Sequence, residues 1–310
     1  MTGTAGGPLD LEVGIVNTNN ATLLRTCLAS LGAGCGDLKW RVTVLDNAST
    51  DDSVKMIQTE FPGVNLVLST EKVGYARTLN QLARPILDGG TARYVAFVHE
   101  DVEVLPGTLE GLVRAADADP TIGLIGPAIR DAAGNRQESF LAFPSPGREA
   151  IMGFRPGMRR PLAAEEGWLD GPCLLLRVEA LRQVRGFDER FFIFFEDVDM
   201  ARRLSASGWK VKQDRSVEIV HRRHGSTGQS AVAGRMEFHL LRSRYLYFEK
   251  HFGRPTAHAV VRAIQLSFGA RAAKALVMGR LRNDADEARL GQKLRQLARY
   301  HAARPIESHP

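Results

Sequence analysis

Cysteines and long apolar runs are scarce in this sequence, and each shortage excludes a class of protein. Only 3 cysteines occur in 310 residues, so a disulfide scaffold is excluded and a reducing compartment is expected. No apolar run approaches the roughly 20 residues that a transmembrane helix needs. The first ten residues carry neither a basic nor an apolar segment, so we expect no signal peptide. Together these features predict a cytoplasmic protein.

Glycine-rich phosphate loops are also absent. The Gly-Ala-Gly-Cys-Gly cluster at residues 32–36 follows an expected helix, whereas a dinucleotide-binding loop needs its glycines between a strand and a helix. We interpret the cluster as a helix C-cap and loop. No Walker A pattern with its lysine occurs either, which argues against a P-loop nucleotide site.

Charge is distributed unevenly along the chain, whose 44% hydrophobic and 25% charged residues are typical of a globular protein. Residues 1–200 carry 19 Lys and Arg against 27 Asp and Glu, a net charge of −8. Residues 201–310 carry 22 against 8, a net charge of +14. The basic end is suited to nucleic acid, a membrane surface or an anionic substrate, and composition alone does not choose among them.

The first half of the chain alternates short apolar strands with helical stretches. Four strands are expected, at residues 11–17, 41–46, 64–69 and 93–99. Asn20 is placed to cap the first helix. This rhythm predicts an α/β fold with a mostly parallel, doubly wound sheet, in which ligands bind beyond the carboxyl ends of the strands. Asp46 and Asp101 both lie at such ends.

The second half is less regular. Residues 131–167 are rich in Gly, Pro and Arg and predict a long loop, which is often functional. A strand is expected over residues 168–177. An acidic helix begins at Glu196, and from about residue 235 the pattern is helical to the end.

Two polar turns follow predicted strands. In Asp-Asn-Ala-Ser-Thr-Asp at 46–51, turn chemistry explains the residue types, and the alternative is that Asp46 accepts hydrogen bonds from a base or ribose. In His-Glu-Asp-Val-Glu at 99–103, three acids within five residues repel one another. Mg²⁺ or Mn²⁺ would offset that repulsion, and the alternative is a solvated acidic loop.

The helix that begins with Glu196-Asp197-Val198-Asp199 carries acids where the helix dipole favours them. Four phenylalanines precede it, and an apolar wall there would raise a carboxylate pKa toward that of a usable base. Further along, His221 and His224 flank two arginines. Their nearest cysteine is 48 residues away, which argues against a structural zinc. One histidine as a further metal ligand and a basic surface turn both remain open.

The order of these motifs is more specific than any one of them. The turn at 46–51 is followed by Val-Gly-Tyr-Ala-Arg-Thr-Leu-Asn at 73–80 and His-Glu-Asp at 99–101. Gly-Phe-Asp-Glu-Arg-Phe-Phe at 186–192 then runs into Glu-Asp-Val-Asp, and a His before Ser follows. Across about residues 11–230 this order resembles the family 2 glycosyltransferases, and within them the rhamnosyltransferase-type branch.

The resemblance implies a GT-A fold, a Rossmann-like sheet flanked by helices with a helical C-terminal extension. Residues 1–230 would form the catalytic domain, with a nucleotide-sugar half at about 11–130 and an acceptor half at about 131–230. Residues 231–310 would form a basic helical region. The implied reaction is an inverting, metal-dependent transfer of a sugar, for which we expect rhamnose, from a dTDP- or UDP-sugar to a glycan or polyprenyl-linked acceptor.

The resemblance also assigns roles to residues. Asp197 would be the general base, with Glu196 as the other candidate, and Asp101 with His221 would bind Mg²⁺ or Mn²⁺. The nucleotide-sugar side would include Asn17, Asp46, Ser49, Gly74, Asn80, His99, Glu100 and Asp101. The acceptor side would include Trp168, Asp170 and Gly171. The sequence departs from the family at His99, where the motif usually has Asp or Asn, and this puts the ribose contact there in doubt.

The C-terminal part of the chain is strongly basic. Residues 235–304 carry 15 Lys and Arg against 5 Asp and Glu. An apolar stripe there predicts packing against the catalytic domain, peripheral membrane contact or a homodimer (Val261, Ile264, Phe268, Ala272 and Leu276).

A sugar nucleotidyltransferase would need a glycine-rich basic loop after the first strand, and residues 16–20 lack it. A nucleic-acid-binding module would leave the acidic motifs unexplained, so we expect no nucleic acid partner.

Overall fold

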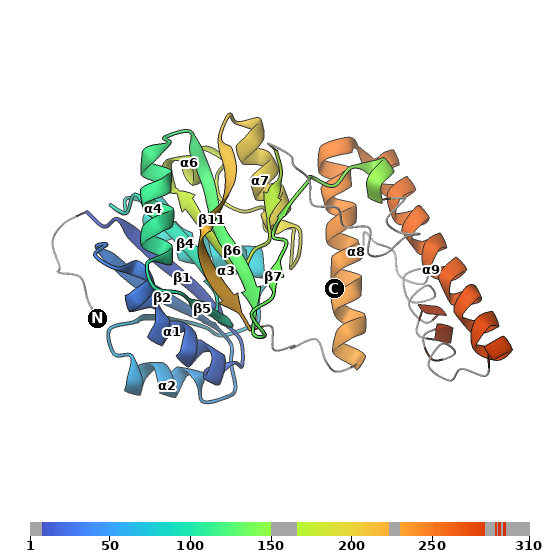
Figure 1. Ribbon diagram of the computed structural model, residues 1–310, viewed down its shortest axis with the longest axis horizontal. Coiled ribbons are helices and arrows are strands. Elements are labelled where there is room, and N and C mark those ends of the chain that lie inside the picture. The colour runs from blue at the N-terminus through green and yellow to red at the C-terminus, as the bar shows by residue number, and fades with distance from the viewer. Residues whose placement is uncertain are drawn as a thin grey trace. The chain divides into compact units, whose positions relative to one another are not determined.

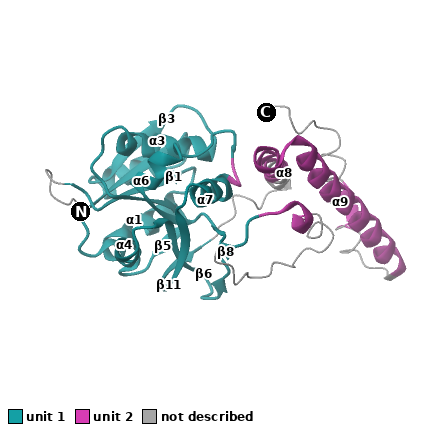
Figure 2. Cartoon of the chain, turned by 90° about the horizontal axis from the view of Figure 1, so that it is seen from above, with its two compact units in different colours: residues 1–143, 161–192, 196–224 teal, residues 144–160, 193–195, 225–310 magenta. Residues whose placement is uncertain are grey.

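The computed structural model describes residues 8–149, 166–222 and 230–282, with a few positions beyond 282. The chain divides into two compact units (Figure 2). Unit 1 comprises residues 1–143, 161–192 and 196–224, and unit 2 comprises residues 144–160, 193–195 and 225–310. The main division, after residue 224, lies six residues before the predicted boundary at 230, and two earlier short segments also belong to unit 2. Within unit 2, Ser243 Oγ donates to the Ile193 carbonyl at 2.7 Å and Arg244 pairs with Glu149 at 2.9 Å.

Unit 1 is built on a nine-stranded sheet of order β3-β2-β1-β4-β10-β6-β11-β5, with β7 paired to β6 (Figure 1). Its strands are β1 Leu11–Asn17, β2 Trp40–Asn47, β3 Asn65–Ser69, β4 Tyr94–His99, β5 Val102–Val104, β6 Ile122–Asp131, β7 Arg136–Gln137, β10 Cys173–Arg177 and β11 Lys210–His221. The strands β3, β2, β1 and β4 are parallel to one another, as the first half of the sequence predicts, and the α/β class is confirmed.

The second half of the sheet is mixed. β10 runs antiparallel to both β4 and β6, and β11 runs parallel to β6 but antiparallel to β5. The predicted strand over 168–177 is divided into β9 (Trp168–Leu169) and β10, because residues 170–172 form a loop. β9 pairs instead with β8 (Phe140–Leu141), in a separate two-stranded ribbon.

Helices cover both faces of the sheet. The helices are α1 Ala21–Cys35, α2 Ser53–Glu60, α3 Tyr75–Leu87, α4 Thr108–Ala118, α6 Val178–Gln183 and α7 Glu196–Ala206. Alternate side chains of β1 and β4 share one hydrophobic core with α1, α2 and α4. On the opposite face α3 packs closely, because a Cβ at Gly14 of β1 would lie 3.3 Å from Leu82 of α3. Burial on both faces explains the continuous apolar strands of the sequence.

The N-terminus of α1 differs in one detail from the expectation. Asn20 occupies the N-cap position, but its side chain makes no capping hydrogen bond among the described residues. Its amide instead lies 3.5 Å from Glu100 Oε1, and Asp51 Oδ2 accepts from the Ala21 backbone N–H at 3.0 Å. A carboxylate from a neighbouring loop therefore accepts a hydrogen bond from one exposed amide at the start of the helix. Its negative charge also interacts favourably with the helix dipole.

Unit 2 contains two long helices, α8 (Ser230–Phe252) and α9 (Arg254–Arg282), that pack on each other (Figure 1). Tyr245, Tyr247 and Phe248 of α8 are almost fully buried, and the Tyr245 ring lies edge-on against His258 of α9 with centroids 5.1 Å apart. Neither these helices nor any other described helix is long and apolar enough to cross a membrane.

We predict that Gly34→Ala destabilises unit 1 although alanine favours helices. α1 packs against β5, and a Cβ at Gly34 would overlap the Val104 side chain. Overpacking of this kind costs about 1–3 kcal/mol. Urea denaturation followed by tryptophan fluorescence measures it, because all three tryptophans lie in unit 1.

The matched control is Ala29→Gly, at an exposed position of the same helix, which should cost only the helix propensity of about 1 kcal/mol. A Gly34→Ala protein as stable as the wild type would show that α1 and β5 are not in close contact.

Candidate functional site

The first group of predicted residues lies where β1 and β2 end. Their register places Asn17 beside Asp46, and Asn17 Nδ2 donates to Asp46 Oδ1 at 2.9 Å and to Ser49 Oγ at 3.1 Å. Asp46 Oδ2 accepts from the Ser49 backbone N–H at 2.9 Å. Ala48, between them, has a φ of 55°, which is uncommon outside glycine. The structure thus contains the turn that the residue types predict, and it leaves the nucleotide contact as a prediction.

A second group joins the ends of three strands. His99 ends β4, His221 ends β11, and Asp101 lies in the turn between β4 and β5. The pairing of His221 with Val102 brings β11 to this turn. One ligand atom from each of the three side chains lies within 4.8 Å of the others. His224, the other predicted candidate, lies outside the described residues.

The charges of this group suit a cation. His221 Nε2 lies 3.2 Å from Asp101 Oδ1, a buried oxygen for which no other partner is found among the described residues. Burial by itself would raise the pKa of Asp101, but the imidazoles of His221 and His99 outweigh it and hold the pKa below its usual value. A carboxylate that stays ionised beside two imidazoles is a fitting set of donors for a divalent metal.

Glu100 lies next to this group but in a different environment. Burial, and secondarily the charge of Asp101, raises the pKa of Glu100 to about 7. Its Oε1 lies 3.5 Å from the Asn20 amide. The two neighbouring acids therefore differ in pKa: that of Asp101 is lowered, and that of Glu100 is raised to about 7.

The third group begins helix α7. Glu196, its first residue, is buried, and its Oε2 has no hydrogen-bond partner among the described residues. Burial, and then repulsion from Asp170, raises the pKa of Glu196 to about 7. Burial, with the charges of Glu196 and Asp170, raises the pKa of Asp197 well above its usual value. The predicted rise in carboxylate pKa is confirmed in direction, with Asp170 as an added cause that the sequence does not reveal.

Gly171 connects the second and third groups. It lies in the loop between β9 and β10, directly after Asp170. A Cβ added there would lie 3.3 Å from Asp197 Oδ2 and 3.8 Å from His99 Nε2. The missing side chain therefore leaves a small volume that a metal-ligand candidate and a base candidate both face. Trp168 lies two residues before this loop, in β9, and its acceptor contact remains a prediction.

Two predicted nucleotide-side residues hold the segment before α7. Asn80 Oδ1 accepts from the Phe187 backbone N–H at 2.8 Å, and its Nδ2 donates to the Phe187 carbonyl at 2.9 Å. The Tyr75 N–H donates to the Phe192 carbonyl at 2.6 Å, and a Cβ at Gly74 would lie 3.0 Å from that same oxygen. Whether Asn80 and Gly74 also contact a nucleotide remains a prediction.

Tyr75 is a site residue that sequence reasoning missed. Its ring lies edge-on against His99, with centroids 5.5 Å apart. Burial, and then the charges of Glu196, Glu100, Asp197 and Asp101, raises the pKa of its hydroxyl well above the usual value. The aromatic residue inside the Gly-Tyr-Ala motif was the available signal, because its position at a helix start directs it to the carboxyl edge of the sheet.

The family model of glycosyl transferase family 2 matches residues 12–185, more than half of the chain. The N-acetylglucosaminyl-diphospho-decaprenol L-rhamnosyltransferase of Mycobacterium tuberculosis is 33% identical over 234 residues, which cover 68% of this chain and 76% of that protein. The O-antigen biosynthesis protein RfbC of Myxococcus xanthus is 26% identical over 221 residues, but these cover only 17% of its length.

Solved structures show the same fold. The mannosyltransferase PcManGT from Pyrobaculum calidifontis, in complex with GDP-Man and Mn²⁺, has a TM-score of 0.57 at 19% identity, over 96% of this chain and 88% of that chain. TarS from S. aureus in complex with UDP-GlcNAc has a TM-score of 0.52 at 13% identity, over 93% and 92% of the two chains. The predicted GT-A-like architecture is thereby confirmed.

The expected resemblance and the family comparison agree. The motifs at residues 46–51, 73–80 and 99–101 all lie within the matched range, and the structure carries them to one edge of a GT-A-like sheet. Glycosyltransferase activity differs from both alternatives considered from the sequence. A sugar nucleotidyltransferase and a nucleic-acid-binding module are therefore excluded as the primary function. The chain belongs to glycosyl transferase family 2 and is a glycosyltransferase related to a rhamnosyltransferase.

Proposed function

We propose that this glycosyltransferase moves rhamnose from a nucleoside-diphosphate donor to a hydroxyl of a polyprenyl-linked glycan, with inversion at the sugar carbon. The observation that carries the proposal is that a base candidate and a metal-ligand candidate lie beside the same residue: a Cβ at Gly171 would be 3.3 Å from Asp197 Oδ2 and 3.8 Å from His99 Nε2. A base on one side and a cation-binding group on the other are what a single displacement requires. The lipid-linked acceptor and the sugar are supported by the mycobacterial relative's name.

Asp197 is the general base in this proposal. A sugar hydroxyl is a poor nucleophile at neutral pH, so a positioned carboxylate must accept its proton during attack. Asp197 Oδ2 faces the volume at Gly171, whereas Glu196 Oε2 is fully buried. Burial, and then the charges of Glu196 and Asp170, raises the pKa of Asp197 and makes it a stronger base. Glu196 therefore acts through Asp197.

The donor lies on the other side, along the ends of β1, β2 and β4. Asn17 and Asp46 are fixed against each other by their hydrogen bond, so the turn at Ser49 is rigid before a ligand arrives. We place the pyrimidine base and ribose of a dTDP- or UDP-sugar along this turn and its diphosphate beside Asp101. Such placement follows the rule that ligands bind beyond the carboxyl ends of the strands.

A divalent cation held by Asp101, His221 and His99 completes the proposal. When bound, it would neutralise the charge that develops on the leaving diphosphate. His99 contributes an imidazole nitrogen where the family motif usually has an oxygen. Because Mg²⁺ strongly prefers oxygen ligands, two imidazoles with one carboxylate favour Mn²⁺. A Mn²⁺ ion is present in the PcManGT complex, which supports this choice of ion.

Asp197→Asn should reduce the transfer rate by about 10²–10⁴-fold, because the amide cannot accept the hydroxyl proton. Transfer of labelled rhamnose from dTDP-rhamnose to N-acetylglucosaminyl-diphospho-polyprenol measures the rate, and a thermal shift with dTDP-rhamnose and Mn²⁺ measures donor binding. Donor binding should persist in the variant.

Glu196→Gln is the comparison variant, and it should reduce the rate less than Asp197→Asn does. Wild-type turnover by Asp197→Asn would remove Asp197 from the base role. Failure of dTDP-, UDP- and GDP-sugars alike to shift the wild-type melting temperature would overturn the proposed function itself.

Glu196→Gln should also stabilise the protein above pH 7. The pKa of Glu196 is raised from 4.5 unfolded to about 7 folded, so the native state holds a proton that the unfolded state releases. Stability is therefore lost as pH rises from about 4.5 to about 7, and glutamine, which carries no charge, avoids that loss. Urea denaturation should show a gain of roughly 1–3 kcal/mol at pH 8 that vanishes near pH 4.

Glu218→Gln is the control of opposite sign. Arg130 and Arg136 hold the pKa of Glu218 below its usual value, so its removal should destabilise the protein at pH 8. A Glu196→Gln protein that is less stable than the wild type at pH 8 would contradict the prediction. It would show that the ionised Glu196 side chain does not lower the free energy of unfolding.

Mn²⁺ binding should depend on all three proposed ligands. Titration of the apoprotein with Mn²⁺, followed by electron paramagnetic resonance of the free ion, should give one site, and His99→Ala should weaken it at least tenfold. His99→Asp should retain a site but shift the preference toward Mg²⁺. His258→Ala, on α9 of unit 2, is the matched control and should bind as the wild type. Equal Mn²⁺ affinity in wild type and His99→Ala would exclude His99 as a ligand.

A further inference from the structure

Helix α9 has an unusual charge composition. Its 29 residues, Arg254–Arg282, include six Lys or Arg and no Asp or Glu. Helices exposed to water usually mix both signs, because pairs of opposite charge three or four residues apart stabilise them. A helix of this length with cations alone contributes a positive field to whatever lies outside it.

The apolar stripe predicted from the sequence lies on the inner side of α9. Val261, Ile264 and Ala272 are each less than 5% exposed, and Phe268 packs against Ala272 and Leu294. This stripe therefore belongs to the core of unit 2 and is not available as a membrane surface, whereas peripheral membrane contact of the tail stays a prediction. Any contact of α9 with an outside partner must involve the other side of the helix.

The other side carries exposed aliphatic side chains among the cations. Leu266, Val277 and Leu281 are 68%, 55% and 76% exposed, and they are half of the large exposed hydrophobic side chains in the described part of the chain. Eleven and four residues separate them, so they share one side over roughly 22 Å of helix. We call this side, with its exposed cations and small residues, the outer face (Arg262, Leu266, Gly269, Ala270, Ala273, Lys274, Val277, Arg280 and Leu281).

The composition of the outer face discriminates among partners. A second copy paired through the same face would set Arg262, Lys274 and Arg280 against their own kind, with no acid to offset the repulsion. Single-stranded nucleic acid would need aromatic rings for stacking, and the one Phe, Trp or Tyr of α9, Phe268, packs in the core of unit 2. An anionic bilayer offers negative charge for the cations and an apolar interior for the aliphatic side chains.

We propose that the outer face of α9 binds the surface of an anionic phospholipid bilayer. The helix lies in the plane of the headgroups, with Leu266, Val277 and Leu281 inserted toward the acyl chains and the long cationic side chains extended to the phosphates. Small residues at 269, 270 and 273 let the backbone approach the surface between the two apolar ends. The proposal rests on charge and exposure of α9 alone, and it stands or falls independently of the substrate proposed above.

Flotation of the full-length protein with vesicles tests the proposal. We expect the wild type to float with phosphatidylcholine–phosphatidylglycerol vesicles, less in high salt, and not with pure phosphatidylcholine vesicles. The triple variant Leu266→Ser, Val277→Ser and Leu281→Ser should lose at least tenfold in vesicle binding. Reversal of Arg262, Lys274 and Arg280 to Glu should abolish it. Circular dichroism establishes that each variant keeps its helices.

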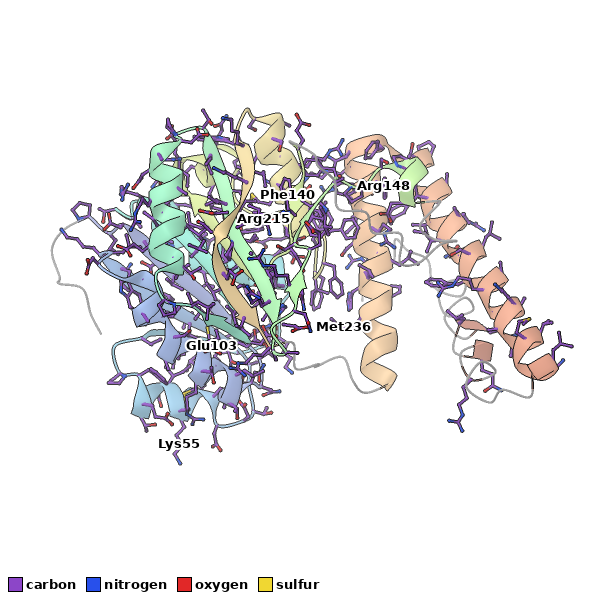
Figure 3. The ribbon with its side chains drawn as sticks, viewed as in Figure 1. Lys55, Glu103, Phe140, Arg148, Arg215 and Met236 are labelled. Carbon is purple, nitrogen blue, oxygen red and sulfur yellow. The ribbon has the colours of Figure 1, made fainter. Side chains whose placement is uncertain are left out.

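Matched controls lie on unit 1. Val67→Ser with Leu68→Ser removes exposed aliphatic side chains from β3, and Lys55→Glu reverses an exposed charge that projects from α2 (Figure 3). Both should float as the wild type does.

Three results would overturn the proposal. The first is no flotation of the wild type with anionic vesicles. The second is equal flotation of the wild type and both triple variants. The third is a dimer in analytical ultracentrifugation that the serine variant converts to a monomer, which would assign the outer face to a second copy of the chain.

Discussion

Mutual repulsion among carboxylates is the constraint on which the site depends. Glu100 and Asp101 from one part of the chain, and Glu196 and Asp197 from another, all raise the pKa of the single Tyr75 hydroxyl. Four acids gathered around one ring at low solvent exposure cannot all be ionised without large cost. In the folded protein, some of these acids must therefore be protonated, and the others must lie beside positive charges.

The structure meets this constraint differently on its two sides. Near β4, the imidazoles of His99 and His221 keep Asp101 ionised. At the start of α7 burial dominates, and it shifts Glu196 and Asp197 toward their protonated forms. The same edge of one sheet thus offers an ionised carboxylate for a cation and weakly acidic carboxylates for a proton. These two environments are the requirements of metal binding and of general base catalysis.

Much of the first half could be predicted from the sequence because its signals are local. β1 is observed over the residues expected, and Asp46 and Asp101 lie at the strand ends where the pattern of apolar runs puts them. The strands β6 and β11 were not predicted, because their pairing brings together residues that are far apart in the sequence. The proximity of His99 to His221 depends on the pairing of β11 with β5, and the effect of Asp170 on the acids of α7 depends on the packing of α7 against β9. Asn20 is the N-cap of α1 as expected, but its side chain makes no capping bond among the described residues, because Asp51 accepts from the Ala21 N–H from outside the helix.

The hydrogen bonds of Asn80 to Phe187 have a consequence for how the sequence of unit 1 can change. A recombination event that exchanged residues 131–230 alone would bring in the segment at 186–192 without the helix that holds it. α3, which carries Asn80 and Tyr75, fixes that segment at Phe187 and Phe192. Residues 73–80 and 186–192 therefore have to change together, because a substitution in one segment alters the hydrogen bonds that hold the other.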